Sequence, residues 1–148
     1  MDNNVRLVLS GRLQELPGNL EHDLTQLAGE TVDNSGLVLN LAINYGGRAE
    51  IVDAVKKICQ HILEGKLDYA QVDEAIFSKY LYTPELPPVD LIVRPSGEKR
   101  ISNFMLWQGA YAELVTLDTY WPSFTRNHLE QALEEYARRE RRFGGLAQ

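Results

Sequence analysis

A short arginine- and glycine-rich segment carries most of the chemistry that this sequence suggests. The segment from Arg94 to Phe104 reads Arg-Pro-Ser-Gly-Glu-Lys-Arg-Ile-Ser-Asn-Phe and directly follows the apolar run Val89–Val93. The planar guanidinium of arginine matches phosphate oxygens, often through two parallel hydrogen bonds. Ser102 would donate a further hydrogen bond from its hydroxyl, and Ile101 one from its backbone amide. The segment predicts a phosphate-binding loop, with a solvated polar loop as the alternative.

A second unusual loop reads Asn-Tyr-Gly-Gly-Arg over residues 44–48 and precedes a helix-period segment. Its two glycines let the backbone approach a ligand, and the N-terminus of a helix favours an anion. The spacing is that of neither a dinucleotide fingerprint nor a P-loop. An anion site and a simple tight turn are both open at this loop.

Three further features have a functional and a structural interpretation. Glu113 closes the run Ala-Tyr-Ala-Glu, and a carboxylate near a bound phosphate would suit Mg²⁺, although an exposed salt bridge is the alternative. Four of the five residues from Arg138 to Arg142 are arginines, which would contact phosphate, contact a partner, or complement the dipole at a helix C-terminus. Cys59 lies on an apolar helix stripe and is expected to be a buried, inert thiol.

The elements that would position these residues alternate along the chain. Four nearly continuous apolar runs predict parallel strands covered on both faces: Val5–Leu9, Leu37–Ile43, Val89–Val93 and Leu114–Leu117. Between and after them, helix periodicity marks residues 20–31, 51–63, 72–81 and 129–137, with Asp68 and Gln71 forming a capping box and a short helix expected before the last strand. The order predicts an α/β fold with a parallel sheet flanked by helices. Ligands of such sheets bind beyond the carboxyl ends of the strands, where both loops lie.

Composition narrows the functional classes. The chain has 148 residues, which predicts one domain over residues 1–148, and its net charge of −6 argues against a nucleic-acid partner. One cysteine excludes an internal disulfide framework. No apolar run is long enough to span a membrane, and the N-terminal residues do not resemble a signal peptide. A reducing, cytoplasmic setting is expected.

Together these motifs resemble the cis-prenyltransferases, the family of bacterial undecaprenyl diphosphate synthase, also called isoprenyl transferase. The resemblance covers nearly the whole chain, with the motifs in the family's order. The segments that carry it are Asn44–Arg48, Arg94–Phe104, Leu106–Gln108, Ala110–Glu113, Trp121–Pro122 and Glu140–Gly145.

The resemblance implies an enzyme that adds isopentenyl diphosphate units to an allylic diphosphate such as farnesyl diphosphate. The new double bonds are cis, Mg²⁺ is the cofactor, and the enzyme is expected to be a homodimer that meets the membrane at most peripherally, through its lipid product. The residues that match the family's isopentenyl diphosphate site are Arg94, Arg100 and Ser102, with Ile101 in the same stretch. Glu113 matches the magnesium-associated glutamate. Arg142 and Gly144 match an Arg-any-Gly motif that reaches toward the active site across the dimer.

One part of the family pattern is absent from this sequence. The family's Asp-Gly-Asn-Gly-Arg-Trp loop, whose aspartate anchors magnesium on the allylic diphosphate, does not occur, so no catalytic residue is assigned here. The sequence resembles the C-terminal portion of the enzyme, without the N-terminal strands and helices of the family fold. Their absence would leave a sheet edge and an apolar face uncovered. We therefore expect the chain alone to be inactive; the alternative is a non-catalytic partner subunit of a heteromeric cis-prenyltransferase.

Overall fold

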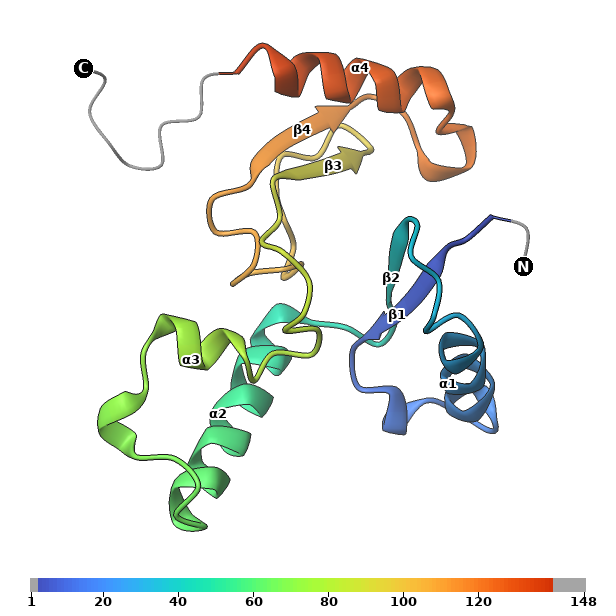
Figure 1. Cartoon of the computed structure of the whole chain (residues 1–148). Coiled ribbons are helices and arrows are strands. Elements are labelled where there is room, and N and C mark those ends of the chain that lie inside the picture. Colours follow the sequence, from blue (N-terminus) through green and yellow to red (C-terminus); the bar gives the residue numbers. More distant parts are fainter. Residues whose placement is uncertain (1–2, 140–148) are drawn as a thin grey trace, which may run out of the picture. The chain divides into compact units, whose positions relative to one another are not determined.

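The structure is a computed structural model that describes residues 3–139 (Figure 1). Its contacts divide the chain into two compact units, Met1–Leu86 and Pro87–Gln148. Each unit contains one pair of parallel strands with helices beside it. The predicted α/β class with parallel strands is therefore confirmed, while the assignment of residues 1–148 to one domain stays a prediction.

The first unit is a strand–helix–strand unit followed by further helices. Strand β1 (Arg6–Ser10) pairs in parallel with β2 (Val38–Ala42), with Arg6 opposite Val38 and Ser10 opposite Ala42. Helix α1 (Leu20–Glu30) makes the crossover and lies against β1, after a short 3₁₀ turn at Leu13–Glu15. The remaining elements are α2 (Gly47–Leu63), a 3₁₀ turn at Tyr69–Gln71, and α3 (Glu74–Ser78).

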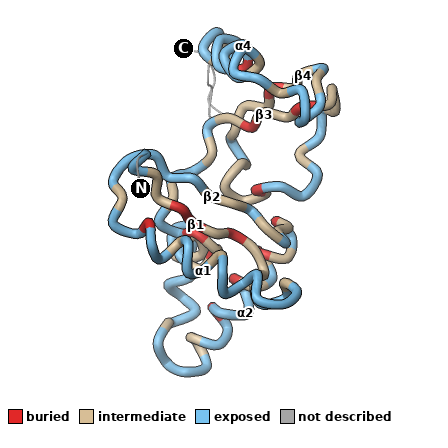
Figure 2. The backbone as a smooth tube through the Cα atoms, turned by 90° about the vertical axis from the view of Figure 1, so that its right-hand side faces the viewer, coloured by how far each residue is buried: buried red, intermediate tan, exposed pale blue. Residues whose placement is uncertain are grey.

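The core of this unit gathers on β1 and one face of α2. Figure 2 shows the buried positions of β1, where Leu7 and Val8 are buried. Ala54 and Ile58 of α2 are also buried, at the helical spacing of four residues. The hydroxyl of Thr31 accepts a hydrogen bond from the Leu7 amide at 2.9 Å, so the start of β1 is satisfied by a side chain of the crossover.

Three expectations for this unit were wrong. The capping box at Asp68 caps only the 3₁₀ turn, and the helix expected over residues 72–81 is shorter because Asp73 caps α3, accepting from the Ile76 amide at 2.7 Å. Strand β2 is not covered on both faces by the described residues, since Leu39 is 45% exposed. Cys59 is exposed rather than buried, because it lies away from the narrow face of α2 that packs.

The second unit pairs β3 (Leu91–Pro95) with β4 (Glu113–Leu117), again in parallel, with Leu91 opposite Glu113. A 3₁₀ turn at Trp121–Ser123 leads to α4 (Arg126–Ala137), which lies against β4. Val115 and Ala132 are fully buried between this strand and helix. The short helix expected before the last strand is absent: residues 102–111 form turns, held by bonds such as that from the Gly109 amide to the Met105 carbonyl at 2.7 Å.

No described helix is both long enough and apolar enough to cross a membrane.

Candidate functional site

The arginine-rich loop begins inside strand β3, and the strand fixes the position of Arg94, the first cation of the loop. Arg94 is a residue of β3 and lies opposite Thr116 in the parallel register. Immediately after the strand, the Ser96 amide donates to the Thr119 carbonyl, and the Gly97 amide donates to the Leu117 carbonyl at 2.9 Å. The loop is therefore tied to the chain that leaves β4. It lies at the carboxyl ends of two parallel strands, where α/β proteins bind ligands.

Glu98 brings the two arginines of the loop to one carboxylate. Arg94 Nη2 donates to Glu98 Oε2 at 2.6 Å, and Arg100 Nη2 donates to Glu98 Oε1 at 2.6 Å. The Arg94 side chain is 25% exposed and the Arg100 side chain 67%. A partly buried, strand-anchored cation and a more exposed one thus converge on a single anionic group. Two guanidinium groups in this arrangement can bind phosphate oxygens.

The backbone of this loop is held in unusual conformations. Left-handed φ values occur at Ser96 (89°), Gly97 (69°), Ser102 (46°), Asn103 (66°) and Met105 (48°). A Cβ at Gly97 would lie 2.6 Å from Asp118 Oδ1, so no larger residue fits there without movement. Such conformations concentrate at ligand clamps, although the amides of Ser96 and Gly97 are themselves bonded to the carbonyls of Thr119 and Leu117.

The predicted donors Ile101 and Ser102 lie in a turn of this loop. The Ile101 carbonyl accepts from the Phe104 amide at 3.0 Å, which closes the turn. Ser102 is exposed, and its hydroxyl makes no hydrogen bond to any residue in the described range 3–139. The structure therefore brings Arg94, Arg100, Ile101 and Ser102 into one loop with an available hydroxyl.

Glu113, the predicted magnesium ligand, is the first residue of β4 and is engaged by the last described helix. Arg139 Nη1 donates to Glu113 Oε2 at 2.7 Å and to the Leu114 carbonyl at 3.1 Å. Arg139 also pairs with Glu135, and its pKa is raised by its hydrogen bond to Glu113 and then by that to Glu135. Of the arginine run, Arg139 therefore ties α4 to β4, while Arg138 pairs with Glu134 of the same helix.

A magnesium ion fits this carboxylate only when other groups supply most of its ligands. Within residues 3–139, no three His, Cys, Asp or Glu side chains form a group that could hold a metal ion. Glu113 retains one carboxylate oxygen, Oε1, that accepts no bond from Arg139. Mg²⁺ commonly uses one or two carboxylates, substrate phosphates and waters, so one carboxylate is a sufficient protein contribution from this unit.

The remaining predicted residues lie elsewhere in the chain. Arg142 and Gly144 lie outside the described residues. The Asn44 loop lies in the first unit and makes structural contacts. The Asn44 side-chain amide donates to the Arg12 carbonyl at 3.0 Å, and the Tyr45 hydroxyl donates to Glu50 Oε2 at 2.6 Å. These contacts fit the tight-turn interpretation of that loop.

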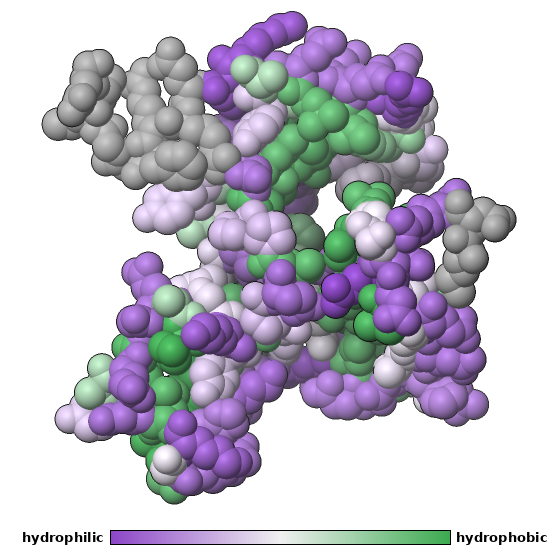
Figure 3. All heavy atoms as spheres, in the orientation of Figure 1, coloured by the Kyte–Doolittle hydropathy of each residue, from purple (hydrophilic) through white to green (hydrophobic). Residues whose placement is uncertain are grey.

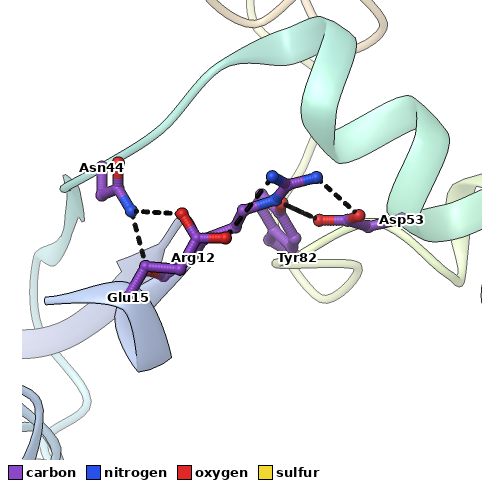
Figure 4. Close-up of polar contacts among 5 residues, drawn as sticks. All are labelled: Arg12, Glu15, Asn44, Asp53 and Tyr82. Atoms are coloured by element: carbon purple, nitrogen blue, oxygen red, sulfur yellow. Dashed lines mark hydrogen bonds and ion pairs between the residues drawn. The ribbon is translucent and has the colours of Figure 1, made fainter.

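Sequence reasoning missed a polar cluster in the first unit, which Figure 4 shows. Arg12 donates from Nε and Nη2 to the two oxygens of Asp53, at 2.8 and 2.9 Å, and the Tyr82 hydroxyl donates to Asp53 Oδ2 at 2.6 Å. The Arg12 hydrogen bond is the main cause that lowers the pKa of Asp53 to about 2, and burial is the main cause that raises the pKa of Tyr82 to about 12. No sequence signal connects these residues, because they are 41 and 29 positions apart.

Comparisons with known proteins agree with these motifs. Residues 1–144 match the prenyltransferase family described as "Putative undecaprenyl diphosphate synthase". The isoprenyl transferase of Heliobacterium mobile is 49% identical over 142 residues, which are 96% of this chain and 55% of that protein. The trans,polycis-polyprenyl diphosphate synthase ((2Z,6E)-farnesyl diphosphate specific) of Thermobifida fusca is 48% identical over 141 residues, 95% of this chain and 50% of that protein.

Solved structures show the same fold. The lavandulyl diphosphate synthase from Lavandula x intermedia, in complex with dimethylallyl diphosphate, matches with a TM-score of 0.93 and 34% identity over 97% of this chain and 62% of that one. A probable undecaprenyl diphosphate synthase from Campylobacter jejuni matches with a TM-score of 0.81 and 37% identity over 96% of this chain and 64% of that one.

The chain spans about half the length of the curated relatives that it matches, which are named isoprenyl transferases and a polyprenyl diphosphate synthase. The family model, in contrast, covers nearly all of this chain. The chain therefore belongs to the prenyltransferase family of the undecaprenyl diphosphate synthases.

Proposed function

We propose that this chain is the isopentenyl diphosphate-binding part of a cis-prenyltransferase, an enzyme that condenses this substrate with an allylic diphosphate to make long-chain polyprenyl diphosphate. The observation that carries the proposal is the convergence of Arg94 and Arg100 on the Glu98 carboxylate. In this proposal the phosphate oxygens of a bound diphosphate take the place of the Glu98 carboxylate oxygens. The names of the relatives, isoprenyl transferase among them, support the same reaction.

In this proposal each residue of the loop has a separate role. Arg94, anchored in β3, and Arg100, which is more exposed, bind the diphosphate of the condensing substrate and replace their bonds to Glu98. Ser102 donates from its hydroxyl, and Ile101 contributes backbone. Arg142 and Gly144, outside the described residues, belong to the same site across a homodimer.

Glu113 would hold the cofactor, Mg²⁺, together with phosphate oxygens. When bound, the ion neutralises charge on the diphosphate that leaves. The arginines act on the other diphosphate: they hold the isopentenyl unit, whose diphosphate stays in the product, so that it is positioned for attack on the allylic carbon. A carbon–carbon bond forms to the isopentenyl unit as the allylic carbon–oxygen bond breaks, and loss of a proton from that unit completes each addition.

The second substrate, the allylic diphosphate, needs a binding loop that this sequence does not contain. No Asp-Gly-Asn-Gly-Arg-Trp run occurs in it. Catalysis requires both substrates to be positioned together, so a chain with only one of the two diphosphate-binding sites does not support turnover. We therefore infer that this chain by itself binds isopentenyl diphosphate weakly and does not condense it, in a cytoplasmic setting.

A second candidate function is that of a non-catalytic partner subunit in a heteromeric cis-prenyltransferase. The run Glu140–Gly145 would suit this role by lending its arginine motif to a catalytic subunit. The intact loop argues against it, since Arg94, Arg100 and Ser102 would not all be needed for lending a C-terminal motif.

Two measurements on the purified chain test the proposal. Isopentenyl diphosphate should shift the backbone amides of residues 96–103 in a saturable NMR titration, and Arg100→Ala should weaken the binding about tenfold, since a charged donor to phosphate is worth ~1.5–3 kcal/mol. Arg126→Ala is the matched control, because Arg126 is exposed and pairs with Glu130 on α4. Absence of saturable shifts in the wild type would overturn the proposed site.

The second measurement is condensation with Mg²⁺, farnesyl diphosphate and labelled isopentenyl diphosphate. We expect no polyprenyl product from the chain alone. A long-chain product would leave the reaction class standing and refute the inference that a further segment or subunit is required.

A further inference from the structure

The first unit contains a hollow at the carboxyl end of its strand pair. Its volume is about 480 Å³, within the range of small-ligand sites. Gly11 and Arg12 directly follow β1, and α2 supplies another wall. The lining residues are Gly11, Arg12, Gln14, Glu15, Asp53, Lys56, Lys57 and Tyr82.

The two carboxylates of the hollow are already occupied by protein donors. Asp53 accepts both bonds from Arg12 and one from the Tyr82 hydroxyl, as Figure 4 shows. Glu15 accepts from the Asn44 amide at 3.2 Å and from Arg12 at 3.5 Å. The two carboxylates therefore share one bonded cation, Arg12, with the Lys56 charge acting on Asp53 from further away, and their other donors are neutral.

Two of the three cations that line the hollow form no ion pair with a carboxylate of the described residues. Lys56 and Lys57 are exposed, and neither forms an ion pair with a carboxylate among residues 3–139. The Lys57 ammonium lies 5.9 Å from the centre of the Tyr82 ring, a distance at which the ring attracts the cation and so limits where its stem can point. Three cations face two carboxylates, and the hollow carries a net positive charge on a chain whose net charge is −6.

We propose that this hollow binds a small, soluble, multivalent oxyanion of the phosphate class, held by Lys56 and Lys57. The Arg12–Asp53 pair, joined by two hydrogen bonds, lines the hollow, and the Gln14 amide adds a neutral donor. Lysine binds phosphate as a point charge from a flexible stem, so two lysines beside this pair suit a compact anion. The proposal goes beyond the proposed function and does not depend on it, because all eight lining residues belong to the first unit.

The test is an NMR titration of the full chain with inorganic pyrophosphate at constant ionic strength and without Mg²⁺. We expect saturable shifts at the amides of residues 11–15 and 53–57. The double variant Lys56→Gln/Lys57→Gln should bind about fivefold more weakly or worse at these amides, because charge-assisted bonds to phosphate are among the stronger polar contacts.

Two matched variants control for overall charge and for the arginine-rich loop. Lys66→Gln/Lys79→Gln also removes two exposed lysines from the first unit, one of them the partner of Glu64. Arg94→Gln/Arg100→Gln disables the loop of the second unit. Both should leave the shifts at residues 11–15 and 53–57 intact, which also separates this proposal from the failure of the proposed function.

Three results would overturn the proposal. The first is a titration without saturable shifts at residues 11–15 and 53–57. The second is equal weakening of pyrophosphate binding by the Lys56→Gln/Lys57→Gln and Lys66→Gln/Lys79→Gln variants. The third is binding to vesicles containing phosphatidylglycerol that depends on Lys56 and Lys57 while pyrophosphate does not shift these amides, because the lysines would then contact a lipid surface.

Discussion

The residue with the clearest consequence for ligand binding is Glu98, which received no role from its sequence position. Its carboxylate holds both arginines of the loop at 2.6 Å. A ligand diphosphate would have to displace it, so Glu98 both shapes the loop and competes with the ligand. The Arg100–Glu98 pair is exposed, and exposed ion pairs are weak, so this half of the exchange is easy; the Arg94–Glu98 pair is partly buried.

Removal of this carboxylate should therefore tighten ligand binding. We expect Glu98→Gln to lower the dissociation constant for isopentenyl diphosphate about threefold, measured from the amides of residues 96–103, in keeping with the modest energy of exposed pairs. Glu130→Gln is the matched control, since it removes a carboxylate that pairs with Arg126 on α4. Unchanged or weaker binding by Glu98→Gln would show that the carboxylate organises the arginines without competing.

A second prediction at the residue scale concerns pH. The pKa of Asp53 is lowered from 3.8 to about 2, mainly by its hydrogen bond to Arg12. A group whose pKa is depressed in the folded state adds stability above its unfolded pKa and loses it as the pH falls through the folded value. We expect Asp53→Asn to lose about 1 kcal/mol of unfolding free energy at pH 7, less than the shift alone implies because solvent reaches the pair.

That deficit should shrink as the pH falls from about 4 toward 2, since protonation then removes the same interaction from the wild type. Urea unfolding at pH 7 and pH 3 measures it. Asp33→Asn serves as the control, because Asp33 is exposed and forms no ion pair with any described residue. A deficit of equal size at both pH values would mean that Asp53 acts through shape and not through charge.

At the scale of the elements, the loops that leave the strands are constrained by close backbone approach. A Cβ at Gly11, where φ is +130°, would lie 1.9 Å from the Ile43 carbonyl oxygen. The amide of Ile43 in turn donates to the Ser10 carbonyl at 2.9 Å. The ends of β1 and β2 therefore come together only because residue 11 has no side chain.

Two glycine substitutions should have opposite effects. Gly11→Ala is expected to cost about 3 kcal/mol or more of unfolding free energy, from backbone strain and a clash with a backbone oxygen. Gly29→Ala, on α1 where an added Cβ would meet nothing within 4 Å, should stabilise by up to about 0.5–1 kcal/mol. Chemical denaturation of both variants checks the pair, and a mild loss for Gly11→Ala would mean that the two strand ends can separate cheaply.

At the scale of the whole molecule, apolar side chains remain uncovered in both units. In the first unit, Val55 of α2 is 45% exposed, Leu63 of α2 89% and Val38 of β2 41%, and Figure 3 shows hydrophobic residues over the helical part of this unit. In the second unit, Leu133 of α4 is 48% exposed. Exposed apolar patches of this kind mark surfaces that another protein segment covers.

In the homodimer expected from the family resemblance, a second copy of the chain would cover such apolar side chains. We expect sedimentation equilibrium of the chain at tens of micromolar to give an average mass above the 16.8 kDa of one copy, because association would bury these side chains. Leu63→Gln and Val55→Gln together should shift the mass toward one copy. The exposed polar pair Gln60→Ala and Glu64→Ala on the same helix end is the control. A mass of 16.8 kDa for the wild type at all concentrations would contradict the homodimer.

The sequence by itself determined the alternation of strands and helices, the arginine-rich loop and the family. These follow from local patterns: apolar runs for the strands, a 3.6-residue period for α1, α2 and α4, and motifs whose order survives without a structure. Boundaries and burial were less predictable. Two capping signals five residues apart, at Asp68 and Asp73, could not be ranked by local reasoning, and the exposure of Cys59 depends on which narrow face of α2 packs.

Only the tertiary structure decided which distant charges meet. Arg12 and Asp53 pair across 41 positions, and Arg139 reaches Glu113 across 26. The contacts of Glu98 are different, because its two arginines are only four and two positions away and lie in one segment whose backbone is left-handed at residues 96 and 97. Charged side chains find partners by proximity in space, and proximity is set by strand register and helix packing, which no single segment of sequence encodes.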